Sequence, residues 1–287
     1  MNLKTLIYAM MLGGALCADS LNAGIVDLVS SAFAVQTPVE PPEVRVLLVH
    51  DQPDVILEVK GNYKIYDPHT NERIAIGVGG KRRHIQALAD GLRWGEEFPG
   101  VHQIAIVPEN LATTIIVDGI EYQGAMYIYD VGGSISVVNR LDVEHYLNIV
   151  LPQRYPELVQ EEVLAAVAIT TRTFNYANLE KRKKALWDLD AQTEGYHGIA
   201  LNKDSKAFEA ALYKTRYIAM ENAESAVFAA SWRLSTSDKR YQGVTYSSIT
   251  LPEAEILARA GQNAVSILKK AFPDTTLELM FPPATKS

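Results

Sequence analysis

The sequence predicts an α+β fold, in which a β-rich N-terminal half is packed with a long central helix and further short strands and helices follow. Two patterns support this prediction. Residues 43–139 form short segments of alternating apolar and polar side chains, separated by turns that contain glycine or asparagine, and this is typical of strands. Residues 156–176 instead repeat their apolar side chains at helical spacing, with Val163, Val167 and Phe174 on one face.

The expected strands follow one another closely in the N-terminal half. They cover residues 44–49, 55–60, 63–66, 104–107, 114–117, 125–130 and 134–139. Gly61 and Asn62 separate the second strand from the third, and such a dipeptide favours a tight turn, so we expect these two strands to form a hairpin. Gly77, Gly79 and Gly80 interrupt the pattern, but no Gly-Lys-Ser or Gly-Lys-Thr follows, which argues against a phosphate-binding loop.

The central helix carries signals for its start and has an alanine-rich second face. Pro156 suits a first helical turn, and Glu157, Glu161 and Glu162 place negative charge near the positive end of the helix dipole. The face opposite the apolar stripe is mostly alanine and carries Arg172 near the C-terminal end. Another backbone segment or a ligand can therefore approach that face closely.

Shorter elements are expected after the central helix. They are an amphipathic helix at residues 205–213, strands at 217–220 and 226–230, and a helix that follows Thr250. Glu253 lies three residues after Thr250, which is the spacing of a capping box. Gly261 suits the end of this last helix, because glycine accepts the left-handed conformation that often closes one.

Charge and cysteine content limit the possible partners and cofactors. The formal net charge is −7 and the sequence pI is near 5.4, which argues against a nucleic-acid-binding protein. Cys17 is the single cysteine, so a chain cleaved after it has neither a disulfide nor a cysteine-containing zinc site. We expect no metal and no other cofactor.

The first residues are typical of an export signal. Lys4 precedes an uncharged apolar run at residues 6–17, and Ala32 and Ala34 form a cleavage site of small residues. We therefore expect an exported protein of the periplasm or cell envelope, organised as a signal peptide at residues 1–34, a linker at 35–42, a folded domain at 43–280 and a tail at 281–287.

Other interpretations of this N-terminal segment stay open. Cleavage after Ala18 or Ala23 also satisfies the pattern of small residues. A lipid anchor on Cys17 is another possibility, although Leu16 is a poor residue immediately before a lipidated cysteine. The whole segment is alternatively a buried N-terminal helix, since the apolar run is too short to span a bilayer comfortably.

Four stretches carry a family resemblance. They are VNRLDVEHYL at residues 138–147, IVLPQRYP at 149–156, EVLAAVAITTRTF at 162–174 and WDLDAQTEGYHG at 187–198. In order and spacing these resemble the core of the stage II sporulation protein D family, SpoIID, which includes the amidase enhancer LytB. In that family a strand ending "vvN" precedes "ldlEdYL", "GVvpsEmP", a helix "EALKAQAvAaRTy" and later "yDl.atT.dQvY.G". The resemblance covers roughly residues 44–279 and is degraded between residues 231 and 248.

Two positions depart from the family pattern in opposite directions. The glutamate of "sEmP", which is the family's proposed catalytic acid, is Arg154 here. An arginine stays protonated at any accessible pH, so it binds anions or stabilises developing charge but does not act as a general acid and base. The glutamine of the last motif is Glu194 here. We therefore expect Arg154 and Glu194 to form a compensating ion pair.

The resemblance implies a protein that remodels peptidoglycan, in cell division or in sporulation-type wall remodelling. Its partners would be glycan strands, which it binds and, given a suitable acid, cleaves as a lytic transglycosylase. The catalytic candidates are Glu194 first, then Glu144 and Glu157. Glu144 has a structural alternative, as a cap or as the partner of an arginine. The expected substrate-binding residues are Arg154, Arg172, Tyr196 and Asp188.

Two alternatives to an enzyme stay open. The first is a protein that binds glycan without chemistry of its own or enhances a partner cell-wall amidase. The second is a structural, β-rich envelope protein with no role on glycan. For the basic run Lys81-Arg82-Arg83-His84 two interpretations also stay open, a solvated loop or a contact for carboxylates on a stem peptide of the cell wall.

Overall fold

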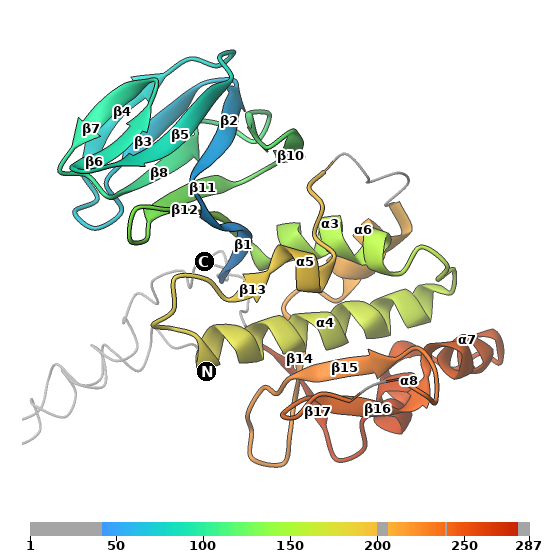
Figure 1. Cartoon of the computed structure of the whole chain (residues 1–287). Coiled ribbons are helices and arrows are strands. Elements are labelled where there is room, and N and C mark those ends of the chain that lie inside the picture. Colours follow the sequence, from blue (N-terminus) through green and yellow to red (C-terminus); the bar gives the residue numbers. More distant parts are fainter. Residues whose placement is uncertain (1–41, 200–205, 239, 281–287) are drawn as a thin grey trace, which may run out of the picture. The chain divides into compact units, whose positions relative to one another are not determined.

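The α+β class is confirmed by the computed structural model, which describes residues 42–199, 206–238 and 240–280 (Figure 1). The expected signal peptide with its cleavage and lipidation sites, most of the linker, and the tail lie outside the described residues. In the part of the chain that is described, no helix combines the length and apolar character needed to cross a membrane.

The β-rich half is built from two sheets that share one core. A seven-stranded sheet has the order β13-β1-β12-β11-β8-β3-β4, and a six-stranded sheet has the order β10-β9-β2-β5-β6-β7. The first sheet contains β1 (Glu43–Gln52), β3 (Tyr63–Tyr66), β4 (Arg73–Gly77), β8 (Gln103–Pro108), β11 (Ala125–Asp130), β12 (Ile135–Asp142) and β13 (Leu189–Asp190). The second contains β2 (Asp54–Lys60), β5 (Arg83–Leu88), β6 (Gly91–Trp94), β7 (Glu96–Pro99), β9 (Thr114–Val117) and β10 (Ile120–Tyr122). Buried side chains of both sheets, such as Leu57 and Ile106, belong to one hydrophobic cluster.

The predicted hairpin between β2 and β3 is wrong, because the two strands lie in different sheets. β2 pairs with β5 and β9, whereas β3 pairs with β4 and β8. Gly61 has φ 125° at the corner, and a Cβ there would lie 2.3 Å from the Thr113 hydroxyl oxygen. A dipeptide such as Gly61-Asn62 suits a corner between two sheets as well as a hairpin turn. Only the pairing of each strand with strands distant in the sequence distinguishes the two cases.

The segment between residues 143 and 161 also differs from the prediction. A short turn or helix around Glu144, followed by a loop, was expected there, but α3 (Val143–Arg154) is a continuous helix of 12 residues that includes Pro152. Asp142 caps it, accepting hydrogen bonds from the backbone N–H groups of Glu144 and His145. The central helix α4 (Glu161–Lys181) consequently starts later than expected, and Pro156 lies in the turn between the two helices.

The central helix is enclosed on all sides along most of its length. Every residue from Val163 to Thr173 is buried, including those on the alanine-rich face. Helices α3, α6 (Lys206–Lys214), α7 (Leu251–Arg259) and α8 (Ala264–Ala271) contact it, as do strands β14 (Ile218–Glu221) and β15 (Ala230–Arg233). A helix that is apolar all round is expected to be buried in this way.

The C-terminal part adds two small sheets and confirms the predicted cap. β14 pairs with β17 (Thr276–Leu279), and β15 runs parallel to β16 (Thr245–Thr250). Strand β15 starts four residues later than the strand predicted at residues 226–230. The capping box of Thr250 and Glu253 is present at the start of α7, and Gly261, with φ 85°, follows its end.

Candidate functional site

Glu144 and Arg172 form an ion pair in the interior of the helical part. The Arg172 side chain has no exposed surface, and it donates from Nε to Glu144 Oε1 at 2.6 Å and from Nη2 to Oε2 at 2.7 Å. Its Nη1 donates to the backbone carbonyl of Ile218 at 3.0 Å. The guanidinium therefore joins α3, α4 and β14. Glu144 is the partner of an arginine, which is the structural role that the sequence analysis left open for it.

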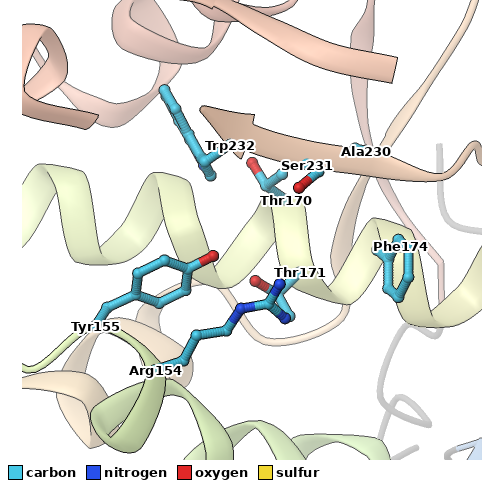
Figure 2. Close-up of a pocket in the computed structure, with 8 residues that line it drawn as sticks. All are labelled: Arg154, Tyr155, Thr170, Thr171, Phe174, Ala230, Ser231 and Trp232. Carbon is cyan, nitrogen blue, oxygen red and sulfur yellow. The ribbon is translucent and has the colours of Figure 1, made fainter. Parts of the chain in front are cut away.

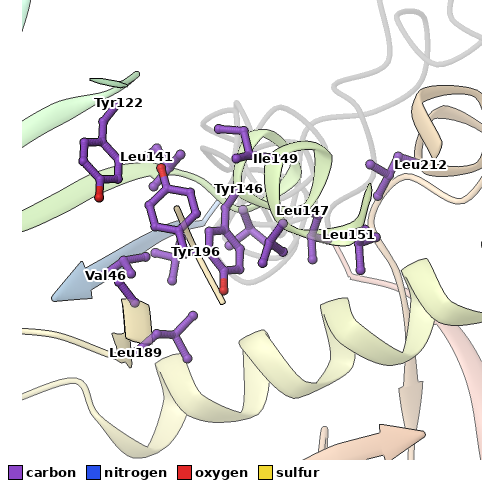
Figure 3. Close-up of a cluster of buried hydrophobic side chains, with 14 of the residues drawn as sticks. Val46, Tyr122, Leu141, Tyr146, Leu147, Ile149, Leu151, Leu189, Tyr196 and Leu212 are labelled. Carbon is purple, nitrogen blue, oxygen red and sulfur yellow. The ribbon is translucent and has the colours of Figure 1, made fainter. Parts of the chain in front are cut away.

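Tyr196 is held in a similar way. Its hydroxyl donates to Asn139 Oδ1 at 2.7 Å, and its ring packs at a tilt against Tyr122 and Tyr146 (Figure 3). Burial raises the pKa of the Tyr196 hydroxyl well above its ordinary value, so it stays protonated as a donor. Asn139 in turn donates to the carbonyl groups of Gln123 and Ala125 at 3.0 and 3.1 Å.

Asp188 accepts three hydrogen bonds from one residue. The backbone N–H of Arg45 donates to Oδ2 at 2.9 Å, its Nε donates to the same oxygen at 3.0 Å, and its Nη2 donates to Oδ1 at 2.6 Å. The Asp188 side chain has no exposed surface. This pair ties the segment before β13 to strand β1.

Three residues predicted to bind substrate therefore do not face solvent in this structure. Arg172, Tyr196 and Asp188 are buried and have internal partners, whereas contact with a polymer requires an exposed side chain. The sequence showed them only as motif positions, and a motif position carries no information on whether it faces a ligand or the core. We assign these side chains to the framework that holds the site.

Arg154 and Glu194 form the ion pair that the sequence predicted. Arg154 ends α3 and Glu194 ends the short helix α5 (Ala191–Glu194), and Arg154 Nη1 lies 3.1 Å from Glu194 Oε2. The arginine side chain is 37% exposed and the glutamate side chain 12%. Burial raises the pKa of the Glu194 carboxyl above its ordinary value, and the positive charge of Arg154 opposes part of that rise.

A narrow cleft opens beside Arg154. Its lining residues are Arg154, Tyr155, Thr170, Thr171, Phe174, Ala230, Ser231 and Trp232. Figure 2 shows Arg154 and Tyr155 on one side of α4, with Ser231 and Trp232 of β15 on the other. The enclosed volume is about 20 Å³, room for little more than one water molecule.

A wider depression of about 330 Å³ borders the same arginine. It is lined by Pro152, Gln153, Arg154, Pro156, Gly195 and His197. Arg154 is the residue common to this depression and the cleft. Glu157, the last candidate acid, is exposed in the turn that follows α3.

Several residues around Arg154 were not predicted from the sequence. Tyr155 and Trp232 are buried, and the Arg154 guanidinium carbon lies 5.7 Å from the centre of the Tyr155 ring. The indole N–H of Trp232 has no hydrogen-bond partner among the described residues. Trp232 and Ser231 lie in the stretch where the family resemblance is degraded, so no motif pointed to them.

The chemistry of this region suits binding better than proton transfer. A fixed positive charge, aromatic surface and hydroxyl groups are typical of sites that hold polar, hydroxyl-rich or anionic ligands. Both leading candidate acids, Glu194 and Glu144, are engaged by arginines. Each of these carboxylates therefore already has an internal partner.

Exchanging the charges of the Arg154–Glu194 pair tests whether the two positions compensate one another. Arg154→Glu and Glu194→Arg alone each place like charges together, so both are expected to destabilise the protein, and the double variant is expected to recover part of the loss. Urea unfolding of the four proteins should give a coupling free energy of about 0.5–3 kcal/mol. Additive losses would show that the two side chains act independently.

Comparison with known proteins agrees with the resemblance seen in the sequence. The model of the family described as Stage II sporulation protein, SpoIID, matches residues 131–222, which contain the catalytic and substrate-binding residues predicted from the sequence. An uncharacterized protein of Chlamydia pneumoniae is 32% identical over 248 residues, which cover 86% of this chain and 85% of that protein. An uncharacterized protein of Chlamydia muridarum is 30% identical over 256 residues, covering 88% and 83%. No solved structure matches the chain significantly. The family match, with two relatives aligned over most of their length, shows that the chain belongs to the SpoIID family.

Proposed function

We propose that this protein binds glycan strands of cell-wall peptidoglycan at the surface around Arg154, and that it does not cleave them. Membership of the SpoIID family implies a sporulation or cell-wall related role. The observation that carries the proposal is the Arg154–Glu194 ion pair, which places a permanent cation where the family has its proposed acid. The expected export signal agrees with a site of action in the periplasm or envelope.

Arginine suits the recognition of such a strand. Its guanidinium presents several N–H donors in one plane, and sugar hydroxyl, acetamido and carboxylate oxygens accept from them. Arg154 borders both the cleft and the depression, and its side chain is partly exposed. A partly exposed cation at the edge of a depression supplies attraction for a polymer that lies across the surface.

Binding and product analysis test the proposal together. The full chain is incubated with purified sacculi and with glycan strands freed of stem peptides, and bound protein is measured by pulldown. Arg154→Ala is expected to weaken strand binding at least tenfold, since hydrogen bonds to a charged group contribute about 1.5–3 kcal/mol. Arg73→Ala is the matched control, because it removes an exposed arginine from strand β4. Absence of binding to sacculi would favour a structural envelope protein.

The pKa of Glu194 favours one second candidate, a lytic transglycosylase with a relocated acid. Burial raises this pKa, so the carboxylic acid persists to a higher pH than in an ordinary glutamate. The acid would protonate the glycosidic oxygen and then accept a proton from the sugar's own hydroxyl as the anhydro ring closes.

Mass spectrometry of the products decides between these candidates. Anhydro-muramyl ends that vanish in Glu194→Gln would establish the relocated acid, and their yield should fall as pH rises through the raised pKa, because the protonated form is the active one. Ends that persist would point to Glu144 or Glu157. Strand binding without product would establish the non-catalytic protein, and stimulation of an added cell-wall amidase would identify it as an enhancer.

A further inference from the structure

A separate pocket of about 290 Å³ lies in the β-rich half of the protein. It is formed at the ends of β2, β4 and β6 and at the starts of β3, β5 and β7, and it shares no residue with the cleft around Arg154. Tyr63, Trp94, Lys81, Arg83 and Glu96 supply its aromatic and charged groups, and the glycine-rich segment 77–80 forms one wall. Its volume is near the lower end of the range for small-molecule sites.

The glycine-rich wall is fixed by close backbone packing. A Cβ on Gly77 would lie 2.3 Å from the hydroxyl oxygen of Tyr63, and one on Gly79 would lie 2.5 Å from the carbonyl oxygen of Val59. The N–H of Gly80 donates to that same carbonyl at 2.9 Å. Any side chain at Gly77 or Gly79 would push the segment away from the strands, so the glycines explain why this wall is preformed.

An aromatic pair forms another part of the pocket. The rings of Tyr63 and Trp94 are tilted, with their centres 5.6 Å apart. Trp94 is 4% exposed, and its indole N–H has no hydrogen-bond partner among the described residues. A buried donor without a partner costs about 1–3 kcal/mol, so a ligand oxygen that reached it would regain that energy.

The charged groups give the pocket two cations and one carboxylate. Arg83 packs so closely on Gly95 that a Cβ there would overlap its guanidinium. Burial raises the pKa of the Tyr63 phenol above its ordinary value. Arg83 opposes this rise and Glu96 adds to it, so both charged groups lie near Tyr63. The exposed side chains of Ile76 and Val78 add apolar surface to the same pocket.

We propose that this pocket binds a short peptide through its carboxylate. Arg83 and Lys81 would hold the carboxylate, Glu96 would accept an ammonium group of the same peptide, and Ile76 and Val78 would contact small aliphatic side chains. Peptidoglycan stem peptides combine these three features, and the choice of this peptide class rests on the proposed cell-wall function. The chain would then contact the glycan and the peptide parts of one polymer through different surfaces.

Titration calorimetry with the full-length protein tests this proposal. The probe is a synthetic stem tetrapeptide with free carboxylates, and a version with every carboxylate converted to a carboxamide is measured beside it. Arg83→Gln and Lys81→Ala are each expected to raise the Kd at least tenfold. Arg82→Ala is the matched control, because this neighbouring arginine is exposed, carries the same charge and does not line the pocket. It should leave the Kd unchanged.

The outcomes separate this proposal from the strand-binding one. Arg154→Ala should keep peptide binding, and Arg83→Gln should keep binding to peptide-free strands. Equal binding of the amidated peptide, equal loss in Arg82→Ala, or complete competition by inorganic phosphate at the same concentration would each overturn the peptide site. An unchanged thermal unfolding curve of Arg83→Gln shows that lost binding does not come from lost folding.

Discussion

Replacing Glu144 by alanine is expected to lower the free energy of unfolding by about 3–5 kcal/mol. The Arg172 guanidinium is fully buried and makes two of its hydrogen bonds to the Glu144 carboxylate, at 2.6 and 2.7 Å. Without that carboxylate a permanent positive charge stays in the interior with only the Ile218 carbonyl as a partner among the described residues. An uncompensated buried charge is among the most costly defects that a single substitution creates.

Urea unfolding followed by circular dichroism measures this loss. The matched control is Glu161→Ala, which removes a glutamate from an ion pair with Lys214 whose side chains are 61% and 74% exposed. That change is expected to cost far less than the loss of Glu144, because solvent screens exposed charges. Equal losses in the two variants would contradict a buried pair at Glu144 and would favour a surface position for it.

Asn139→Ala is expected to cost about 3 kcal/mol, because one buried side chain is the hydrogen-bond partner of three other polar groups. Asn139 accepts from the Tyr196 hydroxyl and donates to the carbonyls of Gln123 and Ala125, at distances of 2.7, 3.0 and 3.1 Å. The alanine variant leaves the phenol without its acceptor and the two carbonyls without this donor. Tyr196→Phe removes only one hydroxyl and is expected to cost about 1 kcal/mol.

Comparing these variants shows whether Asn139 is the centre of the network. The double variant is expected to be less unstable than the sum of the two single variants, because both singles remove the same hydrogen bond. Denaturant unfolding of all four proteins gives the coupling energy. A loss in Asn139→Ala no larger than that in Tyr196→Phe would show that the carbonyls of Gln123 and Ala125 contribute little.

Most individual strands of the β-rich half were predictable. Alternation of apolar and polar residues predicted strands at 114–117 and 125–130, and β9 and β11 have the same bounds. Strands β5, β6 and β7 were not predicted, because charged residues and glycines interrupt the alternation between residues 83 and 99. The pairing of β2 and β3 was predicted wrongly, since sheet membership depends on contacts with strands far away in the sequence.

The candidate site was predictable to a different degree for each residue. The Arg154–Glu194 ion pair was predicted from two departures of opposite charge at motif positions, and the structure confirms it. The framework roles of Arg172 and Asp188 were not predicted, because their partners, Glu144 and Arg45, lie 28 and 143 residues away. Trp232 was missed for the same reason, as nothing local connects it to Arg154.

Local sequence patterns were enough to predict the α+β class, the long central helix, the capping box of α7 and the exchange of charge at Arg154 and Glu194. These follow from periodicity, local capping chemistry and motif positions, which are properties of short stretches of chain. The burial of Arg172, Tyr196 and Asp188, and the pocket that Arg83 and Trp94 share, depend on long-range contacts in the folded chain. Burial and pairing arise when distant segments exclude water from one another, and no local pattern records which segments those are.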